Sequence, residues 1–402
     1  MASAIIIGGG PAGSVAALLL ARAGFGVELI EQHIFPRDKV CGECLSGVGV
    51  DVLDRAGILG AIEAEGPAQL TRSLLHPTAG PTIEVPLPRV SIGISRSKMD
   101  VVLLDAAMDA GVRLHQPARC EALLSDSRSS FVKRKSANSM LPGFPCSQHG
   151  LEARVTNAPL DKPSVRWRDL QTNQITTTSA DWIIVADGKG AWLNTTRKAT
   201  GDLGIKTHFT NLTSPRDAIE LFAGHGHYGG IAAVEGERWN AAFSVPADLV
   251  RKHSGDLQRV FDQIASGNAM LRERVASAKR VGAWLASPLP RFAVSGDWAD
   301  RVIPIGNAAA ALEPVGGEGM GLALRSAEMA AAAIINAERT GNERPVQNLP
   351  AEFNRLWRLR RTICRGIAMM FSSEYVADAV APLMAANIGI PAAFMRLAGK
   401  AG

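Results

Sequence analysis

Glycines near the amino terminus have the spacing of a phosphate-binding turn. Gly8, Gly10 and Gly13 form G-x-G-x-x-G between the apolar run Ile5–Ile7 and an Ala/Leu-rich segment. The first glycine permits a tight turn, the second lets backbone N–H groups approach a pyrophosphate, and the third allows close packing of a helix on a strand. The helix amino terminus also attracts phosphate charge. The stretch therefore predicts a dinucleotide site.

An acidic residue stands where such a site needs one. Glu31 ends the next apolar run, Val27–Ile30, about 20 residues after the glycines. Its carboxylate would accept hydrogen bonds from a ribose diol. A glycine triplet alone is weak evidence, because it also occurs in simple Gly-rich turns. The strand, helix and acid around this one favour dinucleotide binding.

The surrounding elements indicate an α/β fold. A strand over 5–7, a helix over 13–23 and a strand over 27–30 form a βαβ unit, which predicts a parallel sheet. The apolar run 181–185 is typical of a further buried parallel strand. Helices are expected over 45–56, 98–109, 248–265 and 316–336, with strands over 112–115, 119–124, 165–169, 174–179 and 301–305.

Short alternating strands predict a second, antiparallel sheet. They are expected over 205–210, 218–223, 228–234 and 238–245. Residues 71–87 carry β-branched residues interrupted by prolines, which predicts short strands joined by turns. Residues 126–163 have no apolar period and are interpreted as an exposed insertion without chemistry. From 351 onward the chain is apolar, Met-rich and helical in spacing, typical of a cover or partner surface.

A second Gly-rich region decides which dinucleotide is expected. An apolar strand runs into Gly306-Asn307, and Pro314-Val315-Gly316-Gly317-Glu318-Gly319-Met320-Gly321 then begins a helix. Here the chain resembles the FAD-dependent monooxygenases of the aromatic-hydroxylase type (group A), whose superfamily includes geranylgeranyl reductases and flavin halogenases. That family has Asp where this chain has Asn307; an amide can still donate and accept at a ribityl hydroxyl but brings no charge.

Further motifs carry the same resemblance, in the family's order. They are Ala186-Asp187-Gly188 after a buried strand, Ile94-Ser95-Arg96 with Asp100, and the Lys-x-Cys-Gly-Glu-x-Leu-Ser pattern within residues 37–46. The resemblance implies FAD as cofactor and NAD(P)H as a transient reductant, since only one dinucleotide fingerprint is evident. The implied cofactor-binding residues are Gly8, Gly10, Pro11, Ala12, Gly13, Glu31, Gln32, Arg37, Cys41, Arg96, Asp187, Gly306, Asn307, Pro314, Gly317, Gly319, Met320 and Gly321.

The resemblance also implies a discontinuous domain organisation. We expect a mixed α/β fold in which a Rossmann-like FAD-binding domain with a parallel sheet (residues 1–70, 96–200 and 295–345) is interleaved with an antiparallel-sheet substrate domain. The substrate domain takes residues 71–95 and 201–294. A C-terminal helical segment takes residues 346–402.

Two cysteines in the 37–46 stretch leave alternatives open. Cys41-x-x-Cys44 could be a redox dithiol or half of a zinc site. Because no second Cys pair or Cys/His cluster stands at ligand spacing, we expect no metal. Two packed thiols in a cofactor loop are the favoured interpretation.

His227 and Tyr228 are the candidate catalytic residues. They fall on the predicted substrate sheet, where a His or Tyr could orient or deprotonate a phenol. The sequence favours a polar strand edge or turn over a catalytic role for these residues.

Composition limits the partners. The chain has 402 residues, 47% of them hydrophobic, and a net charge of +5 that is not gathered into a run. Nucleic acid is therefore not expected as a partner. The five cysteines, an odd number, indicate reduced thiols and a cytoplasmic location. No stretch is apolar enough to span a bilayer, while a peripheral membrane or protein partner and the oligomeric state stay open.

The function expected from these motifs is redox chemistry on an apolar molecule. The leading hypothesis is an NAD(P)H-dependent monooxygenase that hydroxylates an aromatic or polyketide-like substrate through a flavin C4a-hydroperoxide. The alternatives are reduction of isoprenoid C=C bonds, as in geranylgeranyl reductases, and modification of a partner protein. Halogenation is remote, because none of the tryptophans stands in the Trp-x-Trp-x-Ile-Pro pattern.

Overall fold

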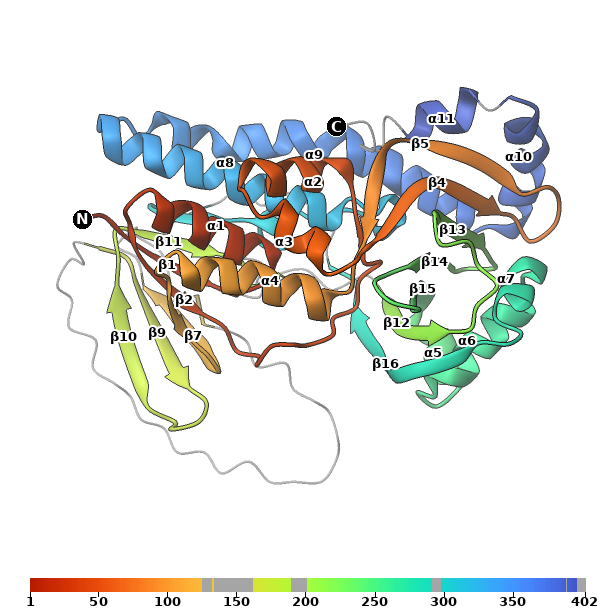
Figure 1. Cartoon of the computed structure of the whole chain (residues 1–402), viewed down its shortest axis with the longest axis horizontal. Coiled ribbons are helices and arrows are strands. Elements are labelled where there is room, and N and C mark those ends of the chain that lie inside the picture. The colour runs from red at the N-terminus through yellow and green to blue at the C-terminus, as the bar shows by residue number, and fades with distance from the viewer. Residues whose placement is uncertain (125–131, 134–161, 189–200, 291–297, 388, 396–402) are drawn as a thin grey trace.

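Two sheets lie side by side along the long axis of the molecule (Figure 1). The computed structural model describes the chain except residues 125–131, 134–161, 189–200, 291–297, 388 and 396–402. Most of the predicted 126–163 insertion therefore lies outside the described residues. The mixed α/β fold class is confirmed by the parallel sheet, the largely antiparallel second sheet and the C-terminal helices.

The first sheet is parallel, in the order β17-β11-β1-β2-β6. Its strands are β1 (Ser3–Ile7), β2 (Gly26–Ile30), β6 (Arg113–His115), β11 (Trp182–Val185) and β17 (Val302–Pro304). Both faces are buried: Ile6 points into the helical core, and Ile5 and Ile7 point into the opposite core. A strand buried on both faces is continuously apolar, which is why these runs were predicted correctly.

Helices cover one face of the parallel sheet and a small antiparallel sheet covers the other (Figure 1). The covering helices are α1 (Pro11–Arg22), α2 (Gly47–Arg55), α3 (Leu59–Ala64), α4 (Arg96–Asp109) and α8 (Gly319–Thr340). The small sheet contains β7 (Ala118–Leu124), β8 (Val132–Lys133), β9 (Ser164–Asp169) and β10 (Ile175–Ser179), in the order β10-β9-β7-β8.

The second large sheet has the order β16-β12-β15-β14-β13-β4-β5-β3. Its strands are β3 (Cys44–Leu45), β4 (Ala68–His76), β5 (Ile83–Gly93), β12 (Asp202–Thr210), β13 (Ala218–Ala223), β14 (Tyr228–Ala233), β15 (Trp239–Pro246) and β16 (Lys279–Pro288). All neighbouring pairs are antiparallel except β13 with β4. The predicted antiparallel sheet is thus confirmed with one parallel exception. Because β3 and the start of β4 belong to it, this sheet takes residues from within the predicted 1–70 segment; the exact domain limits stay a prediction.

Two predicted elements differ in the structure. Residues 71–87 form parts of two long strands rather than several short ones, because Pro86 and Pro88 occupy exposed positions of β5. That strand is at an open edge except where β3 pairs with Ile92 and Gly93, so a missing N–H is tolerated. The single helix expected over 248–265 is two helices, α5 (Ala247–Lys252) and α6 (Leu257–Ser266), because Ser254 and Gly255 between them have positive φ.

The carboxyl-terminal part is helical, as predicted. After α8 the chain forms α9 (Arg344–Phe371), α10 (Glu374–Ala386) and α11 (Gly389–Met395). The shorter α7 (Ala269–Arg274) comes earlier and packs on the second sheet. Phe353 and Trp357 of α9 join the core around the parallel sheet, whereas Ala368 and Phe371 join the core of the second sheet. One long helix therefore packs on both halves of the fold.

Candidate FAD site and adjoining cavity

The glycine turn between β1 and α1 leaves no room for side chains. Gly8 has φ +104, and a Cβ on it would lie 2.6 Å from the Ala186 carbonyl oxygen of the neighbouring strand end. A Cβ on Gly13 would lie 1.8 Å from the Gly8 carbonyl oxygen. Helix α1 starts at Pro11 with Gly10 as N-cap and no side chain bonded to its first amides. These amides are the groups that an anion would use.

Glu31 is buried beside this turn. One carboxylate oxygen accepts a hydrogen bond from the Gly9 N–H at 2.7 Å, and the other accepts one from the His33 N–H at 2.7 Å. Each oxygen keeps a further lone pair. The carboxylate is therefore fixed at the end of β2, with capacity left for a ribose diol. Gln32 follows it and is half-buried.

The second Gly-rich region contacts the first, although the two are far apart in the sequence. Gly306 has φ +59, and a Cβ on it would lie 3.2 Å from the Ala12 Cβ. Asn307 is exposed toward the cavity described below, which Pro314, Gly317, Gly319 and Met320 also line. Gly321 does not line it: a Cβ there would lie 2.4 Å from Ser46 Oγ of α2's N-cap. Gly321 is thus a helix-packing glycine.

A bidentate ion pair holds the start of α4 beside the glycine turn. Arg96 Nε and Nη2 each donate to Asp100 at 2.7 Å. Arg37 lies 3.6 Å from the same carboxylate and over the ring of Phe35, and its buried Nε has no hydrogen-bond partner among the described residues. Asp187 is half-buried. Its chain neighbours Ala186 and Gly188 line the cavity, but Asp187 itself does not. A cationic surface with an unused donor fits an anionic cofactor.

Lys39, the lysine of the Lys-x-Cys-Gly-Glu-x-Leu-Ser pattern, is a further cation in the same place, although no cofactor-binding role was predicted for it from the sequence. It lines the cavity with Gly10 and Pro11, and its Nζ would lie 3.0 Å from a Cβ on Gly188. Desolvation, helped by the nearby charges of Arg96 and Arg37, lowers the pKa of Lys39 from 10.5 to about 8. An ammonium desolvated among other cations gains from an incoming phosphate.

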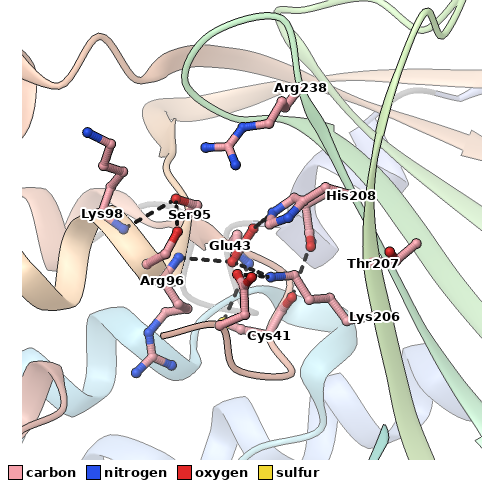
Figure 2. Close-up of polar contacts among 12 residues, drawn as sticks. Cys41, Glu43, Ser95, Arg96, Lys98, Lys206, Thr207, His208 and Arg238 are labelled. Carbon is pink, nitrogen blue, oxygen red and sulfur yellow. Dashed lines mark hydrogen bonds and ion pairs between the residues drawn. The ribbon is translucent and has the colours of Figure 1, made fainter. Parts of the chain in front are cut away.

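Glu43 is the centre of a buried polar network (Figure 2). Its Oε1 accepts from the Arg96 backbone N–H at 2.9 Å and from Lys206 Nζ at 2.8 Å, and His208 Nε2 lies 2.6 Å from Oε2. Lys206 Nζ also donates to Asp38 at 3.0 Å. Lys206 and His208 belong to β12, so the network joins the 37–46 segment, α4 and the second sheet.

This network also has the spacing of a small metal site. One ligand atom each from Asp38, Glu43 and His208 lie within 4.8 Å of one another. However, the Lys206 ammonium lies within hydrogen-bond distance of both carboxylates and already supplies a positive charge between them. We therefore describe the cluster as an ion-pair network. Cys41 and Cys44 are separate thiols, the first half-buried and the second buried.

A cavity of about 520 Å³ extends from the glycine turn to the second sheet and the C-terminal helices. Cys41, Asn307 and the residues of the second Gly-rich region line one part. The part farther away is mainly apolar, lined by Leu75, Leu221, Phe243, Ile367, Met370 and Met384. Both parts are continuous, so a cofactor and an apolar molecule would meet there.

The two candidate catalytic residues separate in the structure. Tyr228 is buried and lines the cavity, and its hydroxyl donates to Glu313 Oε1 at 2.7 Å. His227, half-buried, is not among the lining residues, and its Nδ1 lies 2.9 Å from the His225 carbonyl oxygen. His227 lies in the turn just before β14, whereas Tyr228 is the first residue of that strand. The sequence motif contains Glu43, but its pairing with Lys206 and His208, and that of Glu313 with Tyr228, could not be predicted because the partners lie in distant segments.

Glu43→Gln tests the ion-pair network. The amide keeps the shape of the side chain but removes the charge that neutralises the buried Lys206 ammonium, so we expect the free energy of unfolding to fall by about 3 kcal/mol. Urea titration measures it. Glu84→Gln, which weakens an exposed pair with Arg72, is the matched control with an expected change below about 0.5 kcal/mol. Adding Lys206→Met to Glu43→Gln should restore part of the loss. If Glu43→Gln and Glu84→Gln had equal free energies of unfolding, the ion-pair network would not contribute measurably to stability.

Gly13→Ala tests the phosphate-binding turn. Its methyl group would overlap the Gly8 carbonyl oxygen, so α1 must move away from β1 and we expect the purified protein to lose most of its visible flavin absorbance. The control is Gly60→Ala on α3, where nothing lies within 4 Å of the new methyl group. Flavin retained by Gly13→Ala would show that FAD does not rely on this turn.

Lys39 should make FAD affinity depend on pH. Bound phosphate stabilises the ammonium and raises its pKa above the value of about 8 in the free protein, so affinity should fall as pH rises from about 7 to about 9. Lys39→Met should bind FAD more weakly at pH 7 and lack this decline, as measured by quenching of FAD fluorescence. Lys98→Met, at an exposed pair with Glu65, should keep the wild-type profile. If the FAD affinity of Lys39→Met still fell as pH rises, the pH dependence would belong to another group.

Comparison with known proteins supports the cofactor. The model of a family described as an FAD binding domain matches residues 1–139. Conditioned medium factor receptor 1 of Dictyostelium discoideum is 24% identical, over 82% of this chain and 62% of that protein. A menaquinone reductase of Mycobacterium tuberculosis is 35% identical, over 33% of each chain. The matches thus span less than two thirds of these curated relatives.

Solved structures share the whole fold. The flavin-dependent brominase Bmp2 has a TM-score of 0.75 at 17% identity, covering 99% of this chain and 93% of its own. A geranylgeranyl bacteriochlorophyll reductase-like protein of Thermoplasma acidophilum has a TM-score of 0.74 at 16% identity, covering 100% of this chain and 97% of its own. Pseudomonas aeruginosa PqsL in complex with 2-aminobenzoylacetate has a TM-score of 0.70 at 18% identity, covering 94% of this chain and 99% of its own.

At these identities the structural likeness establishes the fold, and the matched domain establishes the cofactor class. The resemblance predicted from the motifs is confirmed. Residues 1–139 match an FAD binding domain, and the chain as a whole has the fold of FAD-dependent oxidoreductases, shared by halogenases, monooxygenases and reductase-like proteins.

Proposed function

We propose that this protein is an NAD(P)H-dependent FAD monooxygenase that hydroxylates an aromatic or polyketide-like substrate in the cytoplasm. The observation that carries the proposal is the Tyr228 hydroxyl, a fixed polar group on the wall of a mainly apolar cavity. Such a cavity accepts an apolar ring, and one polar group sets the ring's orientation. PqsL, which shares the fold, is described in complex with an aromatic compound.

Tyr228 is held as a neutral hydrogen-bonding group. Burial and the negative charge of Glu313 raise the pKa of Tyr228, so the proton stays on its oxygen at neutral pH. The hydroxyl donates a hydrogen bond to one oxygen of Glu313, and the other oxygen accepts one from Arg365 Nη1 at 2.8 Å. Tyr228's oxygen can then accept from a hydroxyl or amino group of the substrate. Its role is therefore to orient the substrate.

The proposed cofactor residues are those implied by the motifs, with Lys39 added and with Gly321 left out because it packs against Ser46. Bound FAD would supply the redox chemistry, taking electrons from NAD(P)H and using them on dioxygen or on a substrate bond. The glycine turn and the cations Arg37, Lys39 and Arg96 would hold its phosphates, Glu31 its ribose and Asn307 its ribityl chain. The apolar walls would keep water away from the reacting atoms.

Reduction of an isoprenoid C=C bond is the second candidate. Two observations favour it: Cys41, Gly42 and Glu43 of the reductase-like segment line the cavity, and a relative matching a third of the chain is named menaquinone reductase. The far wall of Leu, Phe and Met side chains would suit a long hydrocarbon as well as a ring.

The dependence on dioxygen distinguishes the two candidates. For the monooxygenase we expect NAD(P)H oxidation to accelerate with a phenolic substrate and an oxygenated product to form only in air. A saturated product formed anaerobically from an isoprenoid would select the reductase, and a protein that takes up no flavin would reject both. Mass spectrometry of the products makes the decision.

Tyr228→Phe tests the proposed orientation of the substrate. The variant keeps the ring and removes the hydroxyl, so kcat/KM for a phenol should fall at least about tenfold while flavin content stays unchanged. The control is a substrate analogue without the hydroxyl, for which the two proteins should be equal. An equal loss on both compounds would mean that Tyr228 only shapes the cavity.

A further inference from the structure

The outward face of α10 is apolar along its full length. Tyr375, Val376 and Leu383 are 76%, 46% and 66% exposed. Ala379, Pro382 and Ala386 are also exposed, and these positions recur at the spacing of one helix face. The helix's two acids lie elsewhere: Glu374 is 3.4 Å from His225, and Asp378 accepts from Thr78 and Ala79.

The inner face of α10 is apolar as well. Ala377, Ala381 and Met384 are buried in the core of the second sheet. A helix that is apolar on both faces normally has both faces out of water. The 13 residues of α10 are about 20 Å long, which is too short for the ~30 Å hydrocarbon core of a bilayer. No helix among the described residues is long and apolar enough to cross a membrane.

The preceding helix adds positive charge. Between Phe353 and Phe371 of α9 the sequence contains arginines and no acidic residue. The exposed positions of this stretch that follow one helix face are Arg355, Arg358, Leu359, Thr362, Arg365, Gly366 and Met369. Leu359 and Met369 are 56% and 58% exposed. We call the exposed faces of α9 and α10 the α9–α10 surface.

The same helices form a wall of the cavity. Gly366, Ile367 and Met370 of α9, Met384 of α10 and Pro391 of α11 line it. Gly366 is both exposed and part of this wall. Figure 1 shows α10 and α11 at the end of the molecule away from the parallel sheet. The α9–α10 surface is thus the outer side of the elements that enclose the far, apolar part of the cavity.

We propose that the α9–α10 surface docks on an anionic lipid bilayer. The side chains of Tyr375, Val376 and Leu383 enter the interface, and Arg355 and Arg358 of α9 contact anionic headgroups. Two copies of the chain fit the surface less well, because a symmetric contact would bring like-charged arginine faces together. Resting on the proposed function, the docking would give an apolar substrate dissolved in the bilayer a short route to the cavity.

Vesicle co-sedimentation of the flavin-loaded full chain tests the docking. We expect binding to phosphatidylcholine vesicles that contain phosphatidylglycerol, little binding to phosphatidylcholine alone, and weakening by added salt. Leu383→Asp should lower the affinity at least about tenfold, and Arg355→Ala with Arg358→Ala should lower it for the anionic vesicles specifically. Ile175→Asp, at a 48% exposed apolar residue of β10, is the matched control and should bind like wild type.

The readout does not use turnover, so it is independent of the proposed reaction. Flavin content and circular dichroism show that each variant is folded. Absence of vesicle binding by folded, flavin-loaded protein would overturn the proposal, as would Leu383→Asp binding as tightly as wild type. Self-association that Leu383→Asp abolishes, without vesicle binding, would assign the surface to a second copy of the chain.

Discussion

One buried carboxylate connects the parts of this fold that must meet. Glu43 accepts hydrogen bonds from the start of α4, which belongs with the parallel sheet, and from Lys206 of β12 in the second sheet. A carboxylate taken out of water is costly unless its charge is matched, and the matching ammonium is itself 1% exposed. Separating the two sheets would break this pair and leave both charges without their buried partner, so the pair favours one relative position of the sheets.

That fixed position gives the cavity its character. The 37–46 segment runs between the sheets, and Ser46 at its end donates to Glu318, the N-cap of α8. Asn240 of β15 donates to the Cys41 carbonyl oxygen. The cofactor end of the cavity is therefore built of backbone and charges, while its far end is built of side chains from the second sheet and α9. Which substrate reaches the cofactor end would therefore depend on which molecules fit the apolar end of the cavity.

The sequence predicted the parts that depend on local spacing. The strands around Ile6 and Ile184 are apolar because both of their faces are buried, and Gly8 and Gly13 are required by contacts within one βαβ unit, so a linear pattern revealed both. The Glu43 network could not be predicted, since the pairing of Glu43 with Lys206 depends on tertiary packing that leaves no periodic signal. The same limit applies to Glu313, the partner of Tyr228 in a distant loop, and to the orientation of His227, which lies in the turn before β14.

The contact between Ala12 and Gly306 has a consequence for how the protein matures. The turn that would hold the phosphates is synthesised before the loop that closes the other side of the site. Domains generally fold as units as the chain emerges from the ribosome. Here the first domain is completed by late residues, so an incomplete chain offers the cofactor only half a site. Only a chain that contains both loops would offer FAD the complete site, and FAD bound there would stabilise such chains over ones that lack the second loop.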